Sequence, residues 1–469
     1  MDEGLSGRQI VGETLRILQL DLESRVAPQL SDPDARLAAR MISDLLAFLA
    51  MWHLDLPKTL PSHLAARRLL VNGAEANSAL LPGDLPVEGG EYAILAGLIQ
   101  DRIESDPALD IGSVVAALAA DQALYAEEQA RLVEGAVLAR ERLASVEVEV
   151  TEERARQFAE AILGAGRGVV SLARVPGGMS KESFFLGLSD AAGARSDYLI
   201  RRDLPWGPAQ TTVRDEYVVL SRLFQLGLPI ARPFGCDLTG ILGQPAMLSA
   251  RVPGASGTEP WGADPEARRA VCTDLAEQLA RLHQIEPASV GVKPVSDEPR
   301  EQVRAYVLEW RERWRKNRVH ASPTLAAAFA WLLDNIPSRV DRVSIVHGDV
   351  GFHNMIVDHG RLVALLDWEF FHAGDPTEDL SYCRQFVEPL MPWPDFLAAY
   401  AGAGGGDYAF ENAQFFELWR SVRNSITCSV AWRGFLDGAY PALKMALQGT
   451  SIYRHFVRTT AQALQERLK

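Results

Sequence analysis

The sequence predicts an α+β protein with a small lobe built on a mixed β-sheet, a large, mainly helical lobe, and an extra N-terminal all-α domain. Three observations support this prediction: helical apolar spacing up to about residue 145, strand-like alternation after it, and a return to helical patterns from Pro265. The chain has 469 residues, and a single hydrophobic core stops growing near ~250–300 residues. We therefore expect two or three packed units.

Residues 1–145 are the predicted helical accessory domain. Apolar residues such as Ile10, Leu15 and Leu18 recur three to five positions apart, as on one face of a helix. Stretches that contain proline and glycine, such as 81–91, interrupt this pattern and favour a small bundle over one long helix. Nothing in this region resembles a catalytic cluster. We interpret it as a packing or oligomerisation unit, with a homodimer formed through it as the expected assembly.

Residues 146–252 are the predicted small lobe. Apolar and polar residues alternate on both sides of a turn at Gly177 and Gly178, and DYLIRRDLP supplies a further short strand. The next segment, TTVRDEYVVLSRLFQLG, has helical spacing and ends at Gly227. Two short strand-like runs in GILGQPAMLSARVPG then precede a Pro-Gly break. The predicted order is strands, helix, strands and linker.

Residues 253–469 are the predicted large lobe. Long helical patterns dominate it, as in ARRAVCTDLAEQLARLHQI and REQVRAYVLEWRERW. Two short apolar strands, in SIVHGDV and RLVALLDWEF, interrupt the helices and carry polar residues at their ends. Because polar groups on loops at the ends of rigid elements often supply binding and catalysis, we place the chemistry here.

Three polar residues at the ends of these strands are the types that phosphoryl transfer requires. Asn354 follows Asp349 by five positions, and Asp367 follows it by eighteen. The reaction needs a carboxylate to accept the proton of the attacking hydroxyl and oxygen ligands for Mg²⁺, which Asp and Asn supply. Taken alone, HGD and DW are also common turn sequences. The ordered set, completed by Gly374-Asp375-Pro376 and Asp379, favours catalysis.

The motifs HGDxxxxN, DWE and GDPxxDL resemble those of the aminoglycoside phosphotransferase and choline kinase-like superfamily, relatives of the protein kinases. The resemblance covers roughly residues 150–469. It implies a bilobal protein-kinase-like fold with ATP or GTP as the phosphoryl donor. It also implies that Asp349 is the catalytic base, that Asn354 and Asp367 hold Mg²⁺, and that His347 organises the loop.

The small lobe extends the resemblance through GGMS, LIRR and RDEYVVL, which are nearest to the phosphotransferase domains related to those fused to acyl-CoA dehydrogenases. By this resemblance Gly177, Gly178 and Ser180 face the nucleotide phosphates. Arg201 grips the phosphates in place of the usual Lys, and Glu216 is the ionic partner of Arg201. Without the resemblance, a hairpin turn that binds no ligand and a solvated acid on a helix are the ordinary interpretations.

The acceptor is expected to be a small metabolite with a hydroxyl group. Between residues 400 and 469, eight Lys or Arg stand against five Asp or Glu, although the whole chain has a net charge of −14. This local excess favours an anionic acceptor, a hydroxy acid or a hydroxyacyl-CoA, with Arg420 or Arg423 as a ligand. For any single Arg, a solvated face is the more ordinary explanation. An aminoglycoside or choline-like amine is the alternative acceptor, and a catalytically silent nucleotide-binding scaffold is the alternative of another class.

Composition argues against several other classes of protein. The 47 Lys and Arg against 61 Asp and Glu disfavour non-specific attraction to nucleic acid or anionic membranes. No stretch approaches the ~20 apolar residues of a membrane span, and the N-terminus lacks the pattern of a signal peptide. The four cysteines form no CxxC pair, so we expect buried free thiols. We expect a cytoplasmic protein without nucleic-acid or membrane partners.

Overall fold

The computed structural model describes two compact units of the chain. The described residues are 149–175, 180–204, 207–319, 321–436, 445 and 447–468, with short stretches between residues 19 and 115. One unit consists of Ser145–Leu308 and Ile336–Glu417, and the other includes Glu309–Asn335 and Leu418–Lys469. The predicted N-terminal all-α domain lies largely outside the described residues. The domain boundaries after residues 145 and 252 stay predictions.

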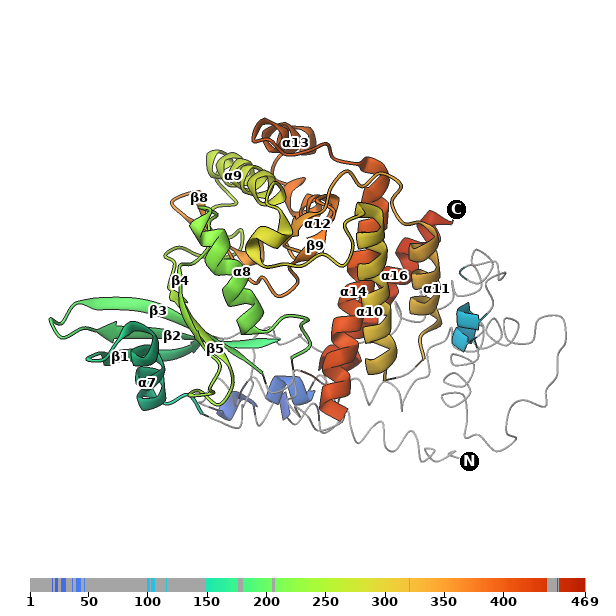
Figure 1. Cartoon of the computed structure of the whole chain (residues 1–469). Coiled ribbons are helices and arrows are strands. Elements are labelled where there is room, and N and C mark those ends of the chain that lie inside the picture. Colours follow the sequence, from blue (N-terminus) through green and yellow to red (C-terminus); the bar gives the residue numbers. More distant parts are fainter. Residues whose placement is uncertain are drawn as a thin grey trace, which may run out of the picture. The chain divides into compact units, whose positions relative to one another are not determined.

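The first unit contains a five-stranded sheet in the order β1-β2-β3-β5-β4 (Figure 1). Its strands are β1 (Gly168–Val175), β2 (Lys181–Ser189), β3 (Arg195–Asp203), β4 (Pro233–Asp237) and β5 (Ala246–Ala250). Every pairing is antiparallel, where a mixed sheet was predicted, because short turns join most consecutive strands. Helix α7 (Glu152–Leu163) covers one face, where Phe158 shares a core with Leu186 and Ile200.

Helix α8 (Val213–Gln225) positions Glu216 beside this sheet. The helix begins with a capping box, in which the side chains of Thr212 and Asp215 satisfy each other's backbone N–H groups. The carboxylate of Asp203, at the end of β3, also accepts a hydrogen bond from the Val213 N–H at 3.0 Å. Two neighbouring elements therefore fix the first turn of α8, where Glu216 is fully buried.

The helical lobe of the same unit contains two small antiparallel strand pairs. Its helices are α9 (Pro265–His283), α12 (Thr377–Val387) and α13 (Trp393–Gly402). Strand β6 (Ser344–Val346) pairs with β9 (His372–Gly374), and β7 (Met355–Asp358) forms a hairpin with β8 (Arg361–Leu365). The core of this lobe includes Leu275, Leu279, Ile345 and Trp368. The polar segments that follow β6 and β8 are thus held on a well-packed base.

Gly254 lies where the chain passes from β5 toward the helical lobe. Its φ is +111°, and a Cβ at this position would lie 2.5 Å from the carbonyl oxygen of Val357. The next residue, Ala255, forms a β-bridge with Val357. Only glycine permits both this backbone conformation and this close approach.

The second unit is helical in its described part. It contains the C-terminal portions of α10 (Pro299–Asn317) and α14 (Phe410–Leu436), with α11 (Pro323–Asp334), the π-helix η6 (Gln448–Ile452) and α16 (Tyr453–Arg467). Trp310 meets Trp419 edge to face, with ring centroids 6.2 Å apart, and Trp314 stacks on Phe329 at 5.6 Å. Core packing therefore accounts for Trp310 and Trp314, as their spacing on one helix face predicts.

Several elements differ from the sequence prediction. Helix α7 was not anticipated, although Ala155, Phe158 and Ala159 recur at helical spacing along it. Only one strand, β5, lies in the 240–254 segment, and its partner β4 comes earlier, in PFGCD. Strands β7 and β9, of four and three residues, were missed. Asp367 consequently follows the third strand of the lobe and not the second.

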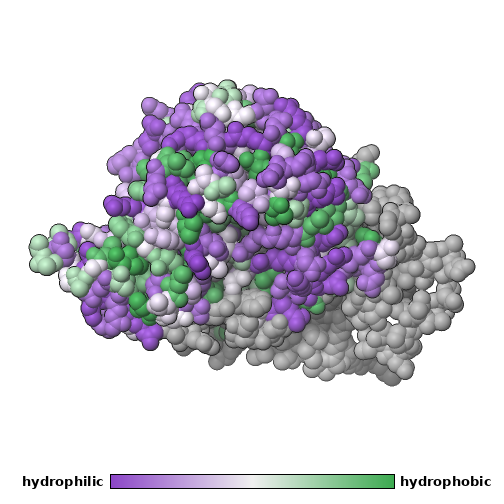
Figure 2. All heavy atoms as spheres, viewed as in Figure 1, coloured by the Kyte–Doolittle hydropathy of each residue, from purple (hydrophilic) through white to green (hydrophobic). Residues whose placement is uncertain are grey.

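The surface drawn in Figure 2 is mostly hydrophilic, and the thiols are free. On the face drawn in Figure 2, hydrophilic side chains predominate and hydrophobic ones form small separate patches. Among the described helices, none combines the length and hydrophobicity that crossing a bilayer requires. All four cysteines are free, three of them buried, which confirms the prediction of free thiols.

Candidate active site

The loop after β6 brings together two of the predicted site residues. The Asn354 amide nitrogen donates to the Asp349 carboxylate oxygen Oδ2 at 2.7 Å and to the Asp349 backbone carbonyl at 3.0 Å. Asn354 is buried, and it belongs to the short 3₁₀-helix η5 (Phe352–Asn354) that directly precedes β7. Asn354 therefore orients the carboxylate that the sequence singles out as the base.

His347 ties this loop to the segment that carries Asp367. Its Nδ1 accepts a hydrogen bond from the Asp349 N–H at 3.2 Å, so its Nε2 carries the proton and donates to the Leu366 carbonyl at 2.9 Å. The imidazole also packs against the Trp368 ring, with centroids 4.4 Å apart. These contacts match the organising role that the resemblance implies for His347.

Asp379, on α12, holds the backbone of the same loop. Its carboxylate accepts from the N–H groups of His347 and Gly348 at 2.8 Å each, and it contacts His283 Nε2 at 3.1 Å. Gly348 has φ of +83°, which turns both N–H groups toward the acid. Burial opposes ionisation of Asp379, but the bonds from His283 and His347 outweigh it and hold its pKa below the usual value. Asp379, the last acid of the GDPxxDL motif, thus fixes the backbone of the loop through hydrogen bonds.

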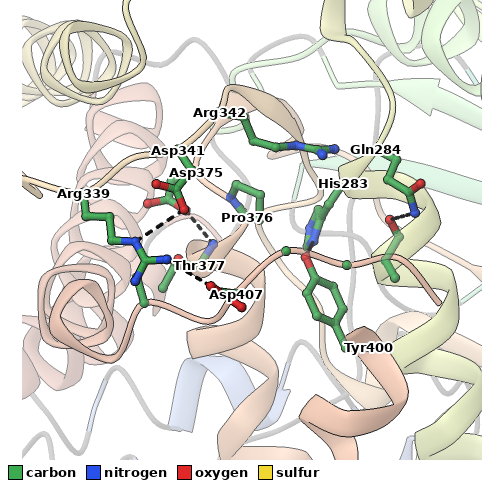
Figure 3. A pocket seen from close by; sticks show the side chains of 14 residues that line it. His283, Gln284, Arg339, Asp341, Arg342, Asp375, Pro376, Thr377, Tyr400 and Asp407 are labelled. Atoms are coloured by element: carbon green, nitrogen blue, oxygen red, sulfur yellow. Dashed lines mark hydrogen bonds and ion pairs between the residues drawn. The ribbon is translucent and has the colours of Figure 1, made fainter. Parts of the chain in front are cut away.

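A small cavity of about 40 Å³ borders His283, the residue that contacts Asp379 (Figure 3). His283 and Tyr400 point toward each other, and the His283 Nδ1 is 2.9 Å from the Tyr400 hydroxyl. Arg339 is held by Asp341 at 3.4 Å and by Asp407 at 3.1 Å. The space is about the size of one or two water molecules, so we interpret it as packing around the loop support.

Asp367 lines a cavity of about 360 Å³ beside the small-lobe sheet. The cavity is lined by residues of both lobes of the first unit, among them Ser180, Arg201, Asn354 and Asp367. Asp367 has φ of +58°, a left-handed conformation that Asp adopts more readily than most residues and that often marks functional positions. Its Oδ1 forms an ion pair with Arg201 Nη2 at 2.9 Å.

The residues at this cavity suit a magnesium ion. The Asn354 amide nitrogen faces Asp349, so its amide oxygen faces away from Asp349, and the Asp367 carboxylate borders the same cavity. Both are hard oxygen donors, which Mg²⁺ prefers. In the described part of the chain, no three His, Cys, Asp or Glu side chains converge on one metal position. Mg²⁺ in nucleotide sites uses one or two carboxylates, with phosphates and water completing the shell.

Glu216 is shared between two cations. Its Oε1 lies 2.7 Å from the Lys181 ammonium group, whereas its Oε2 lies 3.6 Å from Arg201 Nη2. Arg201 is therefore near Glu216 as predicted, but Lys181 makes the closer contact. Burial alone would lower the Lys181 pKa, but Glu216 and Glu369 outweigh it and raise the pKa. Lys181 was not among the predicted site residues, although Lys181 lies on the same face of strand β2 as Ser183 and Phe185.

Ser180 and Glu369 extend the polar network at the cavity. The Ser180 hydroxyl donates to the Glu369 carboxylate, and the Thr211 hydroxyl donates to the Glu369 backbone carbonyl at 3.0 Å. Burial, together with the negative charge of Asp367, raises the pKa of Glu369 well above its usual value. Gly177 and Gly178, predicted to face the phosphates, lie outside the described residues.

The far side of Asp349 is bordered by residues that sequence reasoning did not find. The Tyr382 hydroxyl donates to Asp349 Oδ1, and His353 Nε2 lies 3.9 Å from Asp349 Oδ2. The interaction with Asp349 raises the pKa of His353. Tyr382 lies one helical turn after Asp379 on α12, a spacing that places both toward the same loop. Arg423, a predicted acceptor ligand, is fully buried in the second unit.

Comparisons with known proteins find sequence relatives over about half of this chain. The first two curated relatives are acyl-CoA dehydrogenase family member 10 of Mus musculus, 24% identical over 51% of this chain, and family member 11 of Gallus gallus, 28% identical over 54%. The matches span 23% and 32% of those proteins, so the chain corresponds to less than a third of either relative's length.

A solved structure shares the fold. A candidate aminoglycoside phosphotransferase of Ralstonia eutropha matches with a TM-score of 0.51 at 17% identity, over 68% of this chain and 99% of the other. A choline kinase of Streptococcus pneumoniae covers 66% of this chain with a TM-score of 0.47, at 17% identity and 99% of its own length. The model of the phosphotransferase enzyme family matches residues 171–416, more than half of the chain. The chain therefore belongs to the phosphotransferase enzyme family, whose members phosphorylate hydroxyl groups of small molecules.

Proposed function

We propose that this protein transfers the γ-phosphoryl group of ATP or GTP to a hydroxyl group of a small metabolite. One observation carries the proposal: Asn354 joins the Asp349 carboxylate to a cavity that Asp367 and Arg201 also line. Oxygen ligands for a metal and a cation for phosphates thus line one space, and the proposed base is hydrogen-bonded to one of those ligands, Asn354. This is the set of groups that direct phosphoryl transfer requires.

Asp349 acts as the base in this proposal. Its two carboxylate oxygens are held separately, Oδ2 by Asn354 and Oδ1 by Tyr382. A carboxylate fixed in this way orients the acceptor hydroxyl and takes its proton as the oxygen attacks phosphorus. The Asn354 oxygen and the Asp367 carboxylate would hold Mg²⁺, which supplies neutralisation of the phosphate charge. Arg201 binds phosphate oxygens through its planar fork of N–H donors.

We propose an anionic acceptor, either a hydroxyacyl-CoA or a hydroxy acid. The names of the curated relatives, acyl-CoA dehydrogenase family members, support an acyl-CoA context. His353 and Tyr382 beside Asp349 add no negative charge to this side of the site. An acid-rich pocket, which polycationic aminoglycosides would favour, is not what these two residues provide. The cytoplasmic location and the homodimer formed through residues 1–145 stay predictions.

The test is the Mg²⁺-dependent loss of ATP or GTP in the presence of separate acceptor pools. The pools contain hydroxyacyl-CoAs, hydroxy acids, amino alcohols including choline, and aminoglycosides. We expect turnover with one of the two anionic pools. Turnover with an amine or aminoglycoside pool would reject the anionic acceptor but keep the kinase. Tight nucleotide binding without turnover in any pool would instead support a scaffold.

A further inference from the structure

Lys181 is the cation that Glu216 holds most closely. The distance from the Lys181 ammonium group to Glu216 Oε1 is 2.7 Å, and both side chains are almost completely buried, at 2% and 0% exposure. Arg201 is 3.6 Å from the other oxygen of Glu216, and its Nη2 is also bonded to Asp367 at 2.9 Å. The two cations near Glu216 therefore have different principal partners.

The strand register puts Lys181 on the cavity face of the sheet. In the β2–β3 pairing, Lys181 is opposite Asp203 and Ser183 is opposite Arg201. Directly opposite residues point to the same face, and residues two apart on one strand do so as well. Lys181, Ser183 and Arg201 accordingly line the same cavity as Asp367. An ammonium group on β2 and a guanidinium group on β3 thus border one space.

The Lys181 ammonium group keeps one donor for a ligand. It donates to the Thr211 carbonyl at 3.0 Å and pairs with Glu216 at 2.7 Å. An ammonium group has three donors, so the third can reach an oxygen in the cavity. A buried ion pair of this kind adds little to stability by itself, because desolvation offsets the attraction. Its position beside the proposed metal ligands favours a role in ligand binding.

We propose that Lys181 is a phosphate-binding residue that takes over, from strand β2, the task usually given to a lysine on the third strand. This proposal rests on the proposed function. Glu216 holds the Lys181 ammonium group in place, and the third donor of that group binds a phosphate oxygen of the nucleotide. Arg201 then serves chiefly to hold Asp367 and to contact phosphate from the neighbouring strand β3.

The experiment compares the affinities of the full-length wild type and of Lys181→Met for two probes, ATP and adenosine. Adenosine lacks phosphates, so a phosphate-binding residue affects the affinity for ATP alone. We expect Lys181→Met to weaken ATP binding about tenfold or more, equivalent to ~1.4 kcal/mol, and to leave adenosine binding unchanged. Lys293→Met, which removes an exposed lysine of the same unit, is the matched control and should bind both probes as the wild type does.

Two further variants separate binding from folding. In Lys181→Met, Glu216 is left buried without its closest partner, which lowers stability. The double variant Lys181→Met with Glu216→Gln removes both charges, and it should still bind adenosine normally and ATP weakly. Lys181→Arg keeps a cation and should recover part of the ATP affinity.

The outcomes are distinguishable. Normal ATP affinity in Lys181→Met, or equal weakening for ATP and adenosine in both the single and the double variants, would overturn the role of Lys181 and leave the proposed kinase standing. A wild type that binds ATP no better than adenosine would overturn both proposals together.

Discussion

At the residue scale, the orientation of one carboxylate depends on two neighbours. Asn354 holds Oδ2 of Asp349, and Tyr382 holds Oδ1. A base held at both oxygens keeps its lone pairs aimed at one point, and positioning of this kind contributes strongly to transfer rates. The motif HGDxxxxN reveals only the first of these two contacts.

The Tyr382 contact leads to a prediction about turnover. Tyr382→Phe removes one hydrogen bond to a charged group, which is worth ~1.5–3 kcal/mol, so we expect kcat to fall about tenfold or more. The KM for ATP should not change, because Tyr382 is not among the residues that line the larger cavity. Steady-state kinetics will measure both values. Tyr217→Phe, on α8, is the control. Equal kcat values for the two variants would show that the Tyr382 hydrogen bond to Asp349 does not contribute to turnover.

The charges at the cavity show what sequence analysis can and cannot predict. Asp349, Asn354 and Asp367 were found because their spacing along the chain is itself the signal. The contact between Lys181 and Glu216 joins a strand to a helix. The two residues are 35 positions apart in the sequence, and no local pattern predicts their contact. Identifying Arg201 as the partner of Glu216 followed the family pattern, and the structure adds the nearer Lys181.

At the element scale, the start of α8 depends on the ionisation of Asp203. This carboxylate accepts the Val213 N–H at the helix N-terminus, and burial raises its pKa to about 6 from a usual 3.8. The folded state therefore holds a proton that the unfolded state has released between these pH values. Stability from this group is present below about pH 4 and is lost as the pH rises through 6.

Asp203→Asn tests this linkage. The amide keeps an oxygen for Val213 but does not titrate, so the loss of stability between about pH 4 and 6 should disappear in the variant. We expect the Tm difference between variant and wild type to move in favour of the variant as the pH rises through this range. Thermal unfolding of both proteins at several pH values measures this Tm difference. Parallel pH profiles for the two proteins would show that Asp203 is not the group responsible.

Gly254 leads to a second prediction at this scale. In Gly254→Ala the new Cβ would meet the Val357 carbonyl at 2.5 Å, in addition to the strain of a positive φ. Gly257 also has positive φ, of +84°, but open space around its Cβ position. We expect Gly254→Ala to lower the free energy of unfolding by ~1–3 kcal/mol more than Gly257→Ala. Equal values in urea denaturation would mean that the backbone at residue 254 shifts freely.

Short elements were the least predictable part of the fold. Strands β7 and β9 have four residues or fewer, and their pairing comes from the surrounding core and not from a repeated pattern. Helix α8, by contrast, was predicted together with its end near Gly227, because a capping box, amphipathic spacing and a left-handed glycine all agree.

At the scale of the whole molecule, the described chain falls into two units, and the candidate site lies entirely within one of them. The family match, residues 171–416, covers most of that unit. Helical periodicity and strand alternation predicted a sheet-bearing lobe and a helical lobe correctly, since both depend on long amphipathic elements. The resemblance supplied the kinase-like arrangement, which periodicity alone does not specify.

The central claim is that Asp349 is the base of a phosphoryl transfer. The most direct test measures turnover and ATP affinity together, in the wild type and in Asp349→Ala, with the acceptor pool that supports the highest rate. The account predicts that the variant loses at least ~10²-fold in kcat, the usual scale of general base catalysis, while its ATP affinity stays within about twofold. An Asp349→Ala protein that keeps full turnover would contradict the account.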